Sequence, residues 1–403
     1  MGPDLDNATD RQGVLFLAQV INCNDGITTY CQTLAEGLKA RGIPVYLVSG
    51  SVRSDEKSQR KRELLEQALQ EWRTIEGIKR FPSISVIREI AGFIRSHKIS
   101  AINAHGLGML YLGRVLSLMT GAKLIATYHP SVIGNLHTVV KSATGRWPLG
   151  QRMFLNLFFP DKLIVLSEES VQFMRLNGIW FKNRMVKLYG GTDLSQFHPP
   201  SPAQREAARR AYALDPDDVV IILAGRLAWV KGHDLLVKAV RQLRDQHPEI
   251  KLKCLFVGSG GKDREAEIIS FAHSGGKADE RAFRFLGFMS DVREPLWASD
   301  IFVLPSRFEG FPLGVAEAMS TGLPAIRTPS GGATDQVIDG KTGYIVPFED
   351  VDALADAIRR LADPAVRREM SAQSMDRAQR YFGVKPMVDV LLPMYGLAAD
   401  QAT

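Results

Sequence analysis

The chain has 403 residues, of which 45% are hydrophobic and 23% are charged, an ordinary composition for a soluble globular protein of two or three domains. No stretch reaches the roughly 18 uninterrupted apolar residues of a transmembrane helix, and the polar, acidic start of the chain is unlike a signal peptide. Three scattered cysteines are too few for a disulfide framework or a zinc site, so we expect a protein of the reducing cytoplasm.

The positive charge is concentrated in the first half of the chain. Residues 1–197 contain 24 Lys and Arg against 16 Asp and Glu, whereas residues 198–403 contain 26 against 28. A positive first half suits an anionic partner, either a phosphate-bearing acceptor or a membrane surface, although a solvated face without a partner explains it equally well. No nucleic-acid-binding motif accompanies this charge, so we expect no nucleic-acid partner.

The first half alternates predicted strands and helices. An apolar run at 14–20 indicates a buried strand, and a loop at 22–26 and an amphipathic helix at 27–41 follow it. Residues 53–80 are charged and are expected to be helix or loop. Further strands are predicted at 45–48, 101–104, 123–127 and 163–166, and further helices at 84–97, 107–119 and 168–177. This repetition is typical of a parallel sheet with helices on both faces.

Three prolines at 199, 200 and 202 interrupt the pattern and predict a linker between domains. The pattern then restarts, with strands expected at 219–224, 252–257, 283–286, 301–304 and 324–326, and helices at 233–247, 262–271, 314–321, 351–362, 367–381 and 386–398. We therefore predict an α/β protein of two doubly wound, Rossmann-like domains, 1–197 and 198–383, with the C-terminal helix at 384–403 packing back on the first. Such domains bind ligands at the carboxyl ends of their strands.

The strongest motif is a pair of glutamates, Glu309 and Glu317, that flank the start of the helix after strand 301–304. Backbone N–H groups between the two glutamates gather at the helix N-terminus, which is a binding site for an anion such as a diphosphate. Carboxylates beside such a site accept hydrogen bonds from sugar and ribose hydroxyls.

Shorter motifs accompany this pair in a fixed order along the chain. They are Gly225-Arg226-Leu227, Lys231-Gly232, Phe256 to Gly260, Phe285 to Phe288, Ala298-Ser299-Asp300, Pro305-Ser306, Gly331-Gly332 and Asp339 to Gly343. The ordered set resembles the retaining GT-B glycosyltransferases of family four, also called glycosyl transferases group 1. The resemblance implies two Rossmann-like domains facing across a cleft, and transfer of a sugar from a nucleotide diphosphate to an acceptor hydroxyl with retention of configuration.

The resemblance assigns donor-binding roles in the second domain. Arg226 and Lys231 match the pair that clamps the donor pyrophosphate, where two fixed cations stabilise the charge of the leaving group in place of a metal ion. We therefore expect no metal and no other cofactor. Glu309 matches the residue that contacts the donor sugar, and Glu317 the one that binds ribose. Backbone groups of Gly310, Phe311, Pro312, Leu313 and Gly314 are expected at the phosphates, and those of Gly287 and Phe288 at the base.

In the first domain the expected site residues follow strands. Gly26 opens the helix after the first strand and permits close backbone approach to a phosphate, although Asp25 stands where the family has a second glycine. His129 matches the histidine that lies against the donor sugar and is counted with the catalytic residues. His105 and Asn22 are assigned to the acceptor side. A lone histidine is more often a structural residue, which is the alternative for both His105 and His129.

Two departures from the family pattern bear on the identity of the donor. The chain reads Tyr189-Gly190-Gly191-Thr192-Asp193 where Pro-Asn-Gly-Val-Asp is common, and Asp335 replaces a glutamate after Gly331-Gly332. We expect uridine rather than guanosine as the base. The sequence does not identify the sugar, the acceptor or the oligomeric state.

Other assignments remain open. A GT-B epimerase or phosphorylase, or an inactive subunit that binds a sugar nucleotide, are alternatives to a transferase. Residues 141–159 mix cations with large apolar side chains and predict contact with lipid or an apolar acceptor, the alternative being a core helix with basic ends. The Asp-x-Asp pairs at 4–6 and 215–217 lie in the tail and in a turn, where a metal site is not expected.

Overall fold

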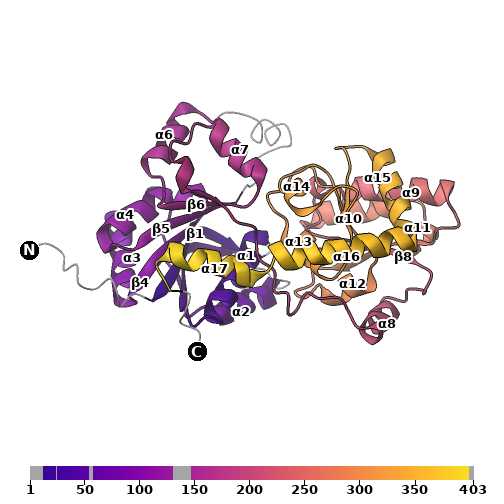
Figure 1. Ribbon diagram of the computed structural model, residues 1–403, viewed down its shortest axis with the longest axis horizontal. Coiled ribbons are helices and arrows are strands. Elements are labelled where there is room, and N and C mark those ends of the chain that lie inside the picture. Colours follow the sequence, from indigo (N-terminus) through magenta and orange to yellow (C-terminus); the bar gives the residue numbers. More distant parts are fainter. Residues whose placement is uncertain (1–11, 24, 54–57, 130–146, 399–403) are drawn as a thin grey trace, which may run out of the picture. The chain divides into compact units, whose positions relative to one another are not determined.

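The computed structural model describes residues 12–23, 25–53, 58–129 and 147–398. The chain divides into two compact units, Met1–Gly191 together with Val384–Thr403, and Thr192–Gly383 (Figure 1). The division after Gly191 lies a few residues before the boundary expected at 197/198.

The first unit is built on a seven-stranded sheet of order β3-β2-β1-β4-β5-β6-β7, in which all neighbours pair in parallel. Its strands are β1 (Gly13–Asn22), β2 (Val45–Arg53), β3 (Glu71–Thr74), β4 (Ile99–His105), β5 (Lys123–Tyr128), β6 (Lys162–Val165) and β7 (Met185–Lys187). Its helices are α1 (Gly26–Lys39), α2 (Gln59–Ala68), α3 (Ile84–Ser96), η3 (Leu107–Met109), α4 (Leu110–Thr120), α6 (Leu149–Leu157), α7 (Glu168–Leu176), η4 (Lys182–Arg184) and α17 (Val384–Tyr395).

The alternation of side chains along β1 explains how this sheet is covered on both faces. Leu15 and Leu17 point into one core with Ile90 and Phe93 of α3, whereas Phe16 points to the other face, where its ring meets that of His105. Because both faces are buried, β1 is a continuous apolar run, as parallel strands usually are. The order of the strands reverses between β1 and β4, which is where such sheets bind ligands.

The second unit has a six-stranded parallel sheet of order β10-β9-β8-β11-β12-β13, which reverses between β8 and β11. Its strands are β8 (Val219–Ala224), β9 (Leu252–Val257), β10 (Phe283–Gly287), β11 (Ile301–Leu304), β12 (Ala325–Arg327) and β13 (Gly343–Ile345). Its helices are α8 (Pro202–Ala211), η5 (Trp229–Lys231), α9 (His233–Gln246), α10 (Lys262–Ala272), α11 (Lys277–Ala282), α12 (Arg293–Ala298), α13 (Leu313–Ser320), α14 (Ala333–Gln336), α15 (Val351–Ala362) and α16 (Pro364–Tyr381). The predicted α/β class with two parallel sheets is confirmed.

The proline-rich segment does not separate the units, because it begins a helix. Ser201 caps α8 by accepting a hydrogen bond from the backbone N–H of Gln204, whose side chain bonds back to Ser201, and Pro202 occupies the first helical turn. A proline is favourable there because that N–H has no partner within the helix. The chain passes between the units after Gly191 and again after Gly383. Close to both points, the Thr192 N–H donates to Phe382 O over 2.7 Å.

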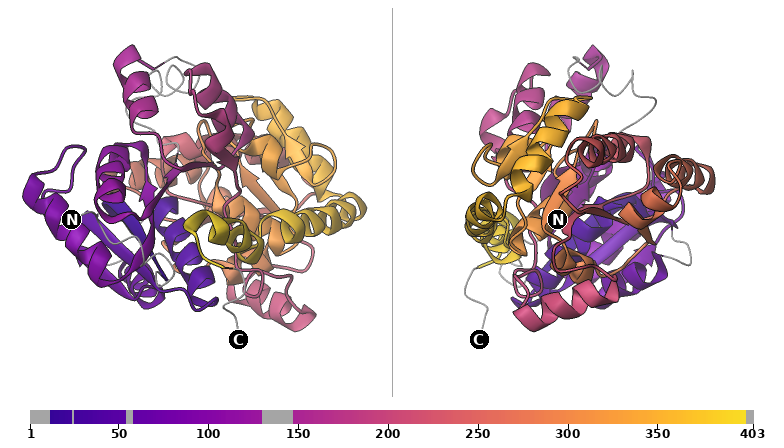
Figure 2. Two further views of the ribbon diagram at one scale, coloured as in Figure 1. Left: turned by 60° about the vertical axis from the view of Figure 1, so that its left-hand side comes forward. Right: turned by 90° about the vertical axis from the view of Figure 1, so that its right-hand side faces the viewer.

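The last helix, α17, belongs to the first unit, where it packs beside α1 (Figures 1 and 2). Gly37 of α1 makes the approach possible, since a Cβ there would lie 2.7 Å from a methyl group of Val384. At the other end of α17, the fully buried Tyr395 hydroxyl accepts a hydrogen bond of 2.8 Å from the Asn103 amide on β4.

Several short elements were not expected from the sequence. Strands β3 and β7 form the two edges of the first sheet and have only four and three residues. An edge strand pairs on one side only and is partly exposed, so it need not carry a continuous apolar run. Among the described residues, no helix is both long enough and apolar enough to cross a lipid bilayer.

Candidate functional site

The loops after β8, β9 and β10 pack backbone against backbone at the carboxyl ends of the strands. Gly225 N–H donates to Val257 O over 2.8 Å, and Gly258 N–H donates to Gly287 O over 2.8 Å. A Cβ on Gly258 would lie only 2.1 Å from Gly225 O, and its φ of +138° disfavours other residues. These glycines therefore bring together the loops that carry the predicted donor-binding residues.

The loop after β8 presents the two predicted phosphate-binding cations. Arg226 is exposed at its start, and Lys231 ends the short helix η5. Gly232 follows with a φ of +72°, and a Cβ there would lie 2.2 Å from Pro305 O. The turn that ends at Lys231 is thus pressed against the segment that follows β11.

Lys231 and Glu309 form an ion pair with 2.7 Å between Nζ and Oε1. Their side chains are 19% and 9% exposed, so the pair is largely shielded from water. The sequence assigns Lys231 to the pyrophosphate and Glu309 to the sugar, and the structure brings the two together. The carboxylate holds the ammonium in one place and leaves it further N–H groups for an anion.

The segment from Glu309 to Gly314 leads into α13. The first N–H groups of a helix have no partner further back in it, and in α13 that of Val315 donates to Pro312 O at the cap over 3.2 Å. It is supported from behind, because a Cβ on Gly331 would lie 2.3 Å from Glu309 O and the Gln336 amide donates to Pro312 O over 2.9 Å. Glu317 lies half-buried about one turn into α13, beside Gly314. The predicted anion site and both glutamates therefore share one short stretch of backbone.

Gly287, which ends β10, and Phe288, which follows it, are the residues expected at the base. Gly287 has a φ of +73° with open space where a side chain would stand, and Phe288 is half-buried. The hydrogen bond from Gly258 ties this loop to the β9 loop. The loop after β10 therefore lies at the carboxyl ends of the strands, like the loop after β8, and β10 is two strands away from β8 in the sheet.

In the first unit the structure pairs the two histidines. His105 ends β4 and His129 follows β5, and 3.1 Å separate His105 Nδ1 from His129 Nε2. The Tyr30 ring meets both imidazoles edge-on, and the Cys31 thiol lies 3.7 Å from His105. Burial lowers the pKa of His129 to about 4. Burial, together with the neighbouring His129, lowers the pKa of His105 well below its ordinary value. Both imidazole rings are therefore neutral at pH 7. In the hydrogen bond between them, one ring nitrogen carries the proton and donates, and the other accepts.

The loop after β1 is arranged around Asp25. Its carboxylate caps α1 by accepting a 3.0 Å hydrogen bond from Thr28 N–H, and burial raises its pKa. The Asn22 carbonyl accepts from the Thr28 hydroxyl over 2.7 Å, so the backbone of Asn22 anchors the loop. Gly26 is exposed, with open space around it. The aspartate in the family's glycine position thus serves as a helix cap.

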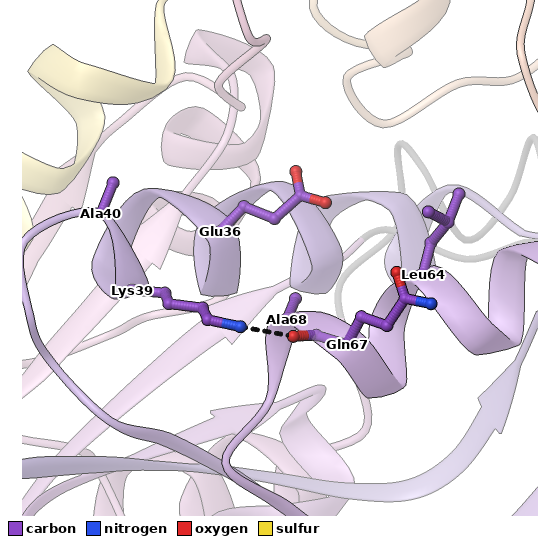
Figure 3. A pocket seen from close by; sticks show the side chains of 6 residues that line it. All are labelled: Glu36, Lys39, Ala40, Leu64, Gln67 and Ala68. Carbon is purple, nitrogen blue, oxygen red and sulfur yellow. Dashed lines mark hydrogen bonds between the residues drawn. The ribbon is translucent and has the colours of Figure 1, made fainter.

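A surface hollow lies between α1 and α2 (Figure 3), lined by Glu36, Lys39, Ala40, Leu64, Gln67 and Ala68. Lys39 Nζ donates to Gln67 O across it over 2.7 Å. It is at the end of α1 away from Gly26, and so away from the carboxyl ends of the strands. Within the described ranges, no group of three or more His, Cys, Asp or Glu residues is arranged to hold a metal ion.

Two family models match the chain. Glycosyltransferase family 4 matches residues 24–196, and glycosyl transferases group 1 matches residues 204–377. Curated relatives include D-inositol 3-phosphate glycosyltransferases of Pseudarthrobacter chlorophenolicus, 32% identical over 52% of this chain and 50% of the relative, and of Actinosynnema mirum, 30% identical over 60% of this chain and 58% of the relative. The chain spans about half the length of the curated relatives it matches.

Solved structures share the whole architecture. Anabaena HepE in complex with UDP and glucose has a TM-score of 0.77 at 19% identity, covering 96% of this chain and 100% of that one. Sucrose-phosphate synthase of Thermosynechococcus elongatus has a TM-score of 0.71 at 22% identity, covering 96% and 98%. Two Rossmann-like units with this strand order define the GT-B class of fold. The chain belongs to the group 1 glycosyltransferases, so the family and fold predicted from the motifs are confirmed.

The buried neutral histidines predict a loss of stability in acid. His129 and His233, the latter at the start of α9, have pKa values lowered by burial from 6.5 to about 4. In this window the unfolded chain binds more protons than the folded chain, so the free energy of unfolding decreases as the pH falls from 6.5 to about 4.

Replacing His129 by glutamine, which does not titrate, should therefore make the decrease between about pH 7.5 and about pH 5 smaller by about 1–2 kcal/mol. Urea unfolding at the two pH values measures this. The exposed His198 provides the control, because His198→Gln should leave the decrease unchanged. An equal decrease in the wild type and in His129→Gln would rule out the explanation.

Proposed function

We propose that the protein transfers a sugar from a nucleoside diphosphate to an acceptor hydroxyl, with retention of anomeric configuration and without a metal ion. The observation that carries the proposal is the Lys231–Glu309 ion pair at the approach to α13. It sets a fixed cation, a carboxylate and a helix N-terminus beside one another, and these are the groups that a sugar diphosphate needs.

In this proposal the second unit binds the donor. The diphosphate lies at the first turn of α13, with Lys231 and Arg226 as its cations. Negative charge grows on the diphosphate as the glycosidic bond breaks, and cations fixed beforehand stabilise that charge without reorganisation. Arg226 presents a planar fork that matches two phosphate oxygens. The carboxylates of Glu309 and Glu317 accept hydrogen bonds from the sugar and ribose hydroxyls.

We propose UDP rather than GDP as the carrier. HepE, which shares the fold, has been crystallised with UDP and with UDP-glucose. The support is an analogy of fold, since the identity to this chain is 18–19%. The loop of Gly287 and Phe288 is the proposed edge of the base site.

For the acceptor we propose a phosphate-bearing molecule that binds the first unit. Residues 1–197 carry 24 Lys and Arg against 16 Asp and Glu, and the curated relatives are named for an inositol phosphate. Within the first unit, Lys61 of α2 reaches the loop after β1, where its ammonium donates to Asp25 O over 3.0 Å. The neutral pair of His105 and His129 lies at the same edge of the sheet and offers hydrogen bonds to hydroxyl groups.

Replacing Lys231 or Glu309 by alanine should reduce turnover at least about 100-fold, the usual scale for the loss of one preorganised charge contact. The measurement is release of UDP from UDP-sugars with phosphorylated acceptors, in buffer that contains EDTA. Lys238→Ala, on the exposed side of α9, is the matched control and should leave turnover unchanged. Unchanged rates in Lys231→Ala, or loss of wild-type activity in EDTA, would contradict the proposal. Turnover of donor without an acceptor would favour an epimerase, and binding without turnover an inactive subunit.

We also propose that α6 lets the protein bind an anionic membrane surface. Leu149, Met153 and Leu157 recur every four residues on this helix, and they are 66%, 58% and 74% exposed. The other face of α6 is buried through Leu155 and Asn156, so the helix covers the core on one side and exposes this apolar row on the other. Residues 141–146 of the segment 141–159 lie outside the described ranges. A half-inserted apolar face on a positively charged unit fits anionic lipid.

Flotation with vesicles of anionic and of neutral lipids tests this proposal. The wild type should float with anionic vesicles, and replacing Leu149, Met153 and Leu157 together by serine should abolish flotation. Leu176→Ser, which removes an equally exposed leucine from α7, should not. Absence of lipid-dependent flotation in the wild type would end the idea.

A further inference from the structure

Arg307 is a buried arginine that lies two residues before Glu309 and that no motif singles out. Its side chain is 5% exposed. The guanidinium forms a fork with Asp234, with both bonds at 2.8 Å, and a second fork with Glu349, at 2.6 and 2.9 Å. A fifth hydrogen bond goes to Trp229 O at 2.6 Å. All five N–H donors of the side chain are thereby used, so Arg307 is not itself available to bind a phosphate.

These contacts hold the turn that carries Lys231. The backbone N–H of Arg307 donates to Val230 O over 2.8 Å, and its guanidinium lies 3.9 Å from the centre of the Trp229 ring. Trp229 and Val230 directly precede Lys231, and Asp234 follows it in the first turn of α9. Arg307 therefore grips the chain on both sides of Lys231, while Glu309 holds the ammonium itself.

The backbone of Glu349 gives a second, independent indication that the surrounding structure holds the Arg307 contacts in place. Its backbone has a φ of +59°, a left-handed conformation that residues other than glycine rarely adopt. Such conformations persist where the surrounding structure over-determines them, and they gather at functional sites. Here the strained residue directs its carboxylate to the guanidinium of Arg307.

We propose that Arg307 is a positioning residue for the donor diphosphate. It sets the place of the Trp229–Lys231 turn, so that the Lys231 ammonium meets the phosphate farther from the nucleoside. The inference rests on the proposed function. Displacement of a binding group by about 1 Å is enough to cost about 100-fold in rate. A lysine at position 307 could not replace the arginine, because an ammonium has no planar fork for two carboxylates.

The test compares ligands that differ by one phosphate. Affinities for UDP and UMP, and for GDP and GMP, are measured by calorimetry on the full chain. In Arg307→Met the dissociation constant of the diphosphate should rise at least about 10-fold, whereas that of the monophosphate should change less than about 3-fold. Lys231→Ala should likewise weaken diphosphate binding more than monophosphate binding, a difference that we call the diphosphate split. Arg307→Lys should not restore diphosphate binding. Glu349→Gln, a milder change at a half-exposed carboxylate, should give a smaller split in the same direction.

Arg241→Met is the matched control. Arg241 of α9 is likewise paired with a carboxylate, because its Nε and Nη2 groups donate to one oxygen of Asp279 at 3.0 and 2.6 Å. Its guanidinium lies over the Phe271 ring and not over Trp229. The Arg241→Met variant should lower the melting temperature as Arg307→Met does. Its dissociation constants for the diphosphate and the monophosphate should change equally or not at all. Two outcomes would overturn the role of Arg307 alone. One is that Arg241→Met also weakens diphosphate binding more than monophosphate binding. The other is that Lys231→Ala has this selective effect, whereas Arg307→Met and Glu349→Gln do not. If the wild type binds none of the four nucleotides, or if Lys231→Ala shows no split, the proposed function fails and this inference with it.

Discussion

The candidate site of the second unit is centred on one ion pair, between the ammonium of Lys231 and the carboxylate of Glu309. Either charge alone would be costly in a place so shielded from water, and removing one partner would leave the other uncompensated. The pair joins the loop after β8 to the loop after β11, the two strands between which the order of the sheet reverses. It therefore fixes a cation and a carboxylate at the position where doubly wound sheets bind their ligands.

The ion pair forms only because the backbones around it approach closely. Gly232 lies against Pro305, Gly258 against Gly225, and Gly331 against Glu309, each at a distance that a Cβ would violate. Arg307 then adds hydrogen bonds to the turn before Lys231. Together these contacts hold the backbone around the two charges, and charges that are positioned in advance stabilise a leaving group most effectively.

The sequence predicts the parts of this architecture that rest on local pattern. Continuous apolar runs mark buried strands such as β8 and β11, and the ordered glycine motifs mark the loops that follow them. Contacts between segments that are distant in the sequence cannot be predicted from local pattern. The ion-pair cluster of Arg307, Asp234 and Glu349 joins three segments that are far apart in the sequence. No motif with a fixed residue spacing links them, so only the folded chain brings them together. The contact of His105 with His129 likewise depends on the register of β4 and β5. The pattern around residues 199–202 does not show that Pro202, a residue that usually interrupts a helix, here occupies the first turn of α8.

We propose that Lys231, Arg226 and the start of α13 hold a diphosphate without a metal ion. A crystal structure of the full chain with UDP, grown in the presence of a chelator, tests this most directly. We expect phosphate oxygens within hydrogen-bonding distance of Lys231 Nζ, of the Arg226 guanidinium and of backbone N–H groups in the first turn of α13. Phosphates bound elsewhere in the chain, or bound only when a divalent cation is supplied, would contradict it.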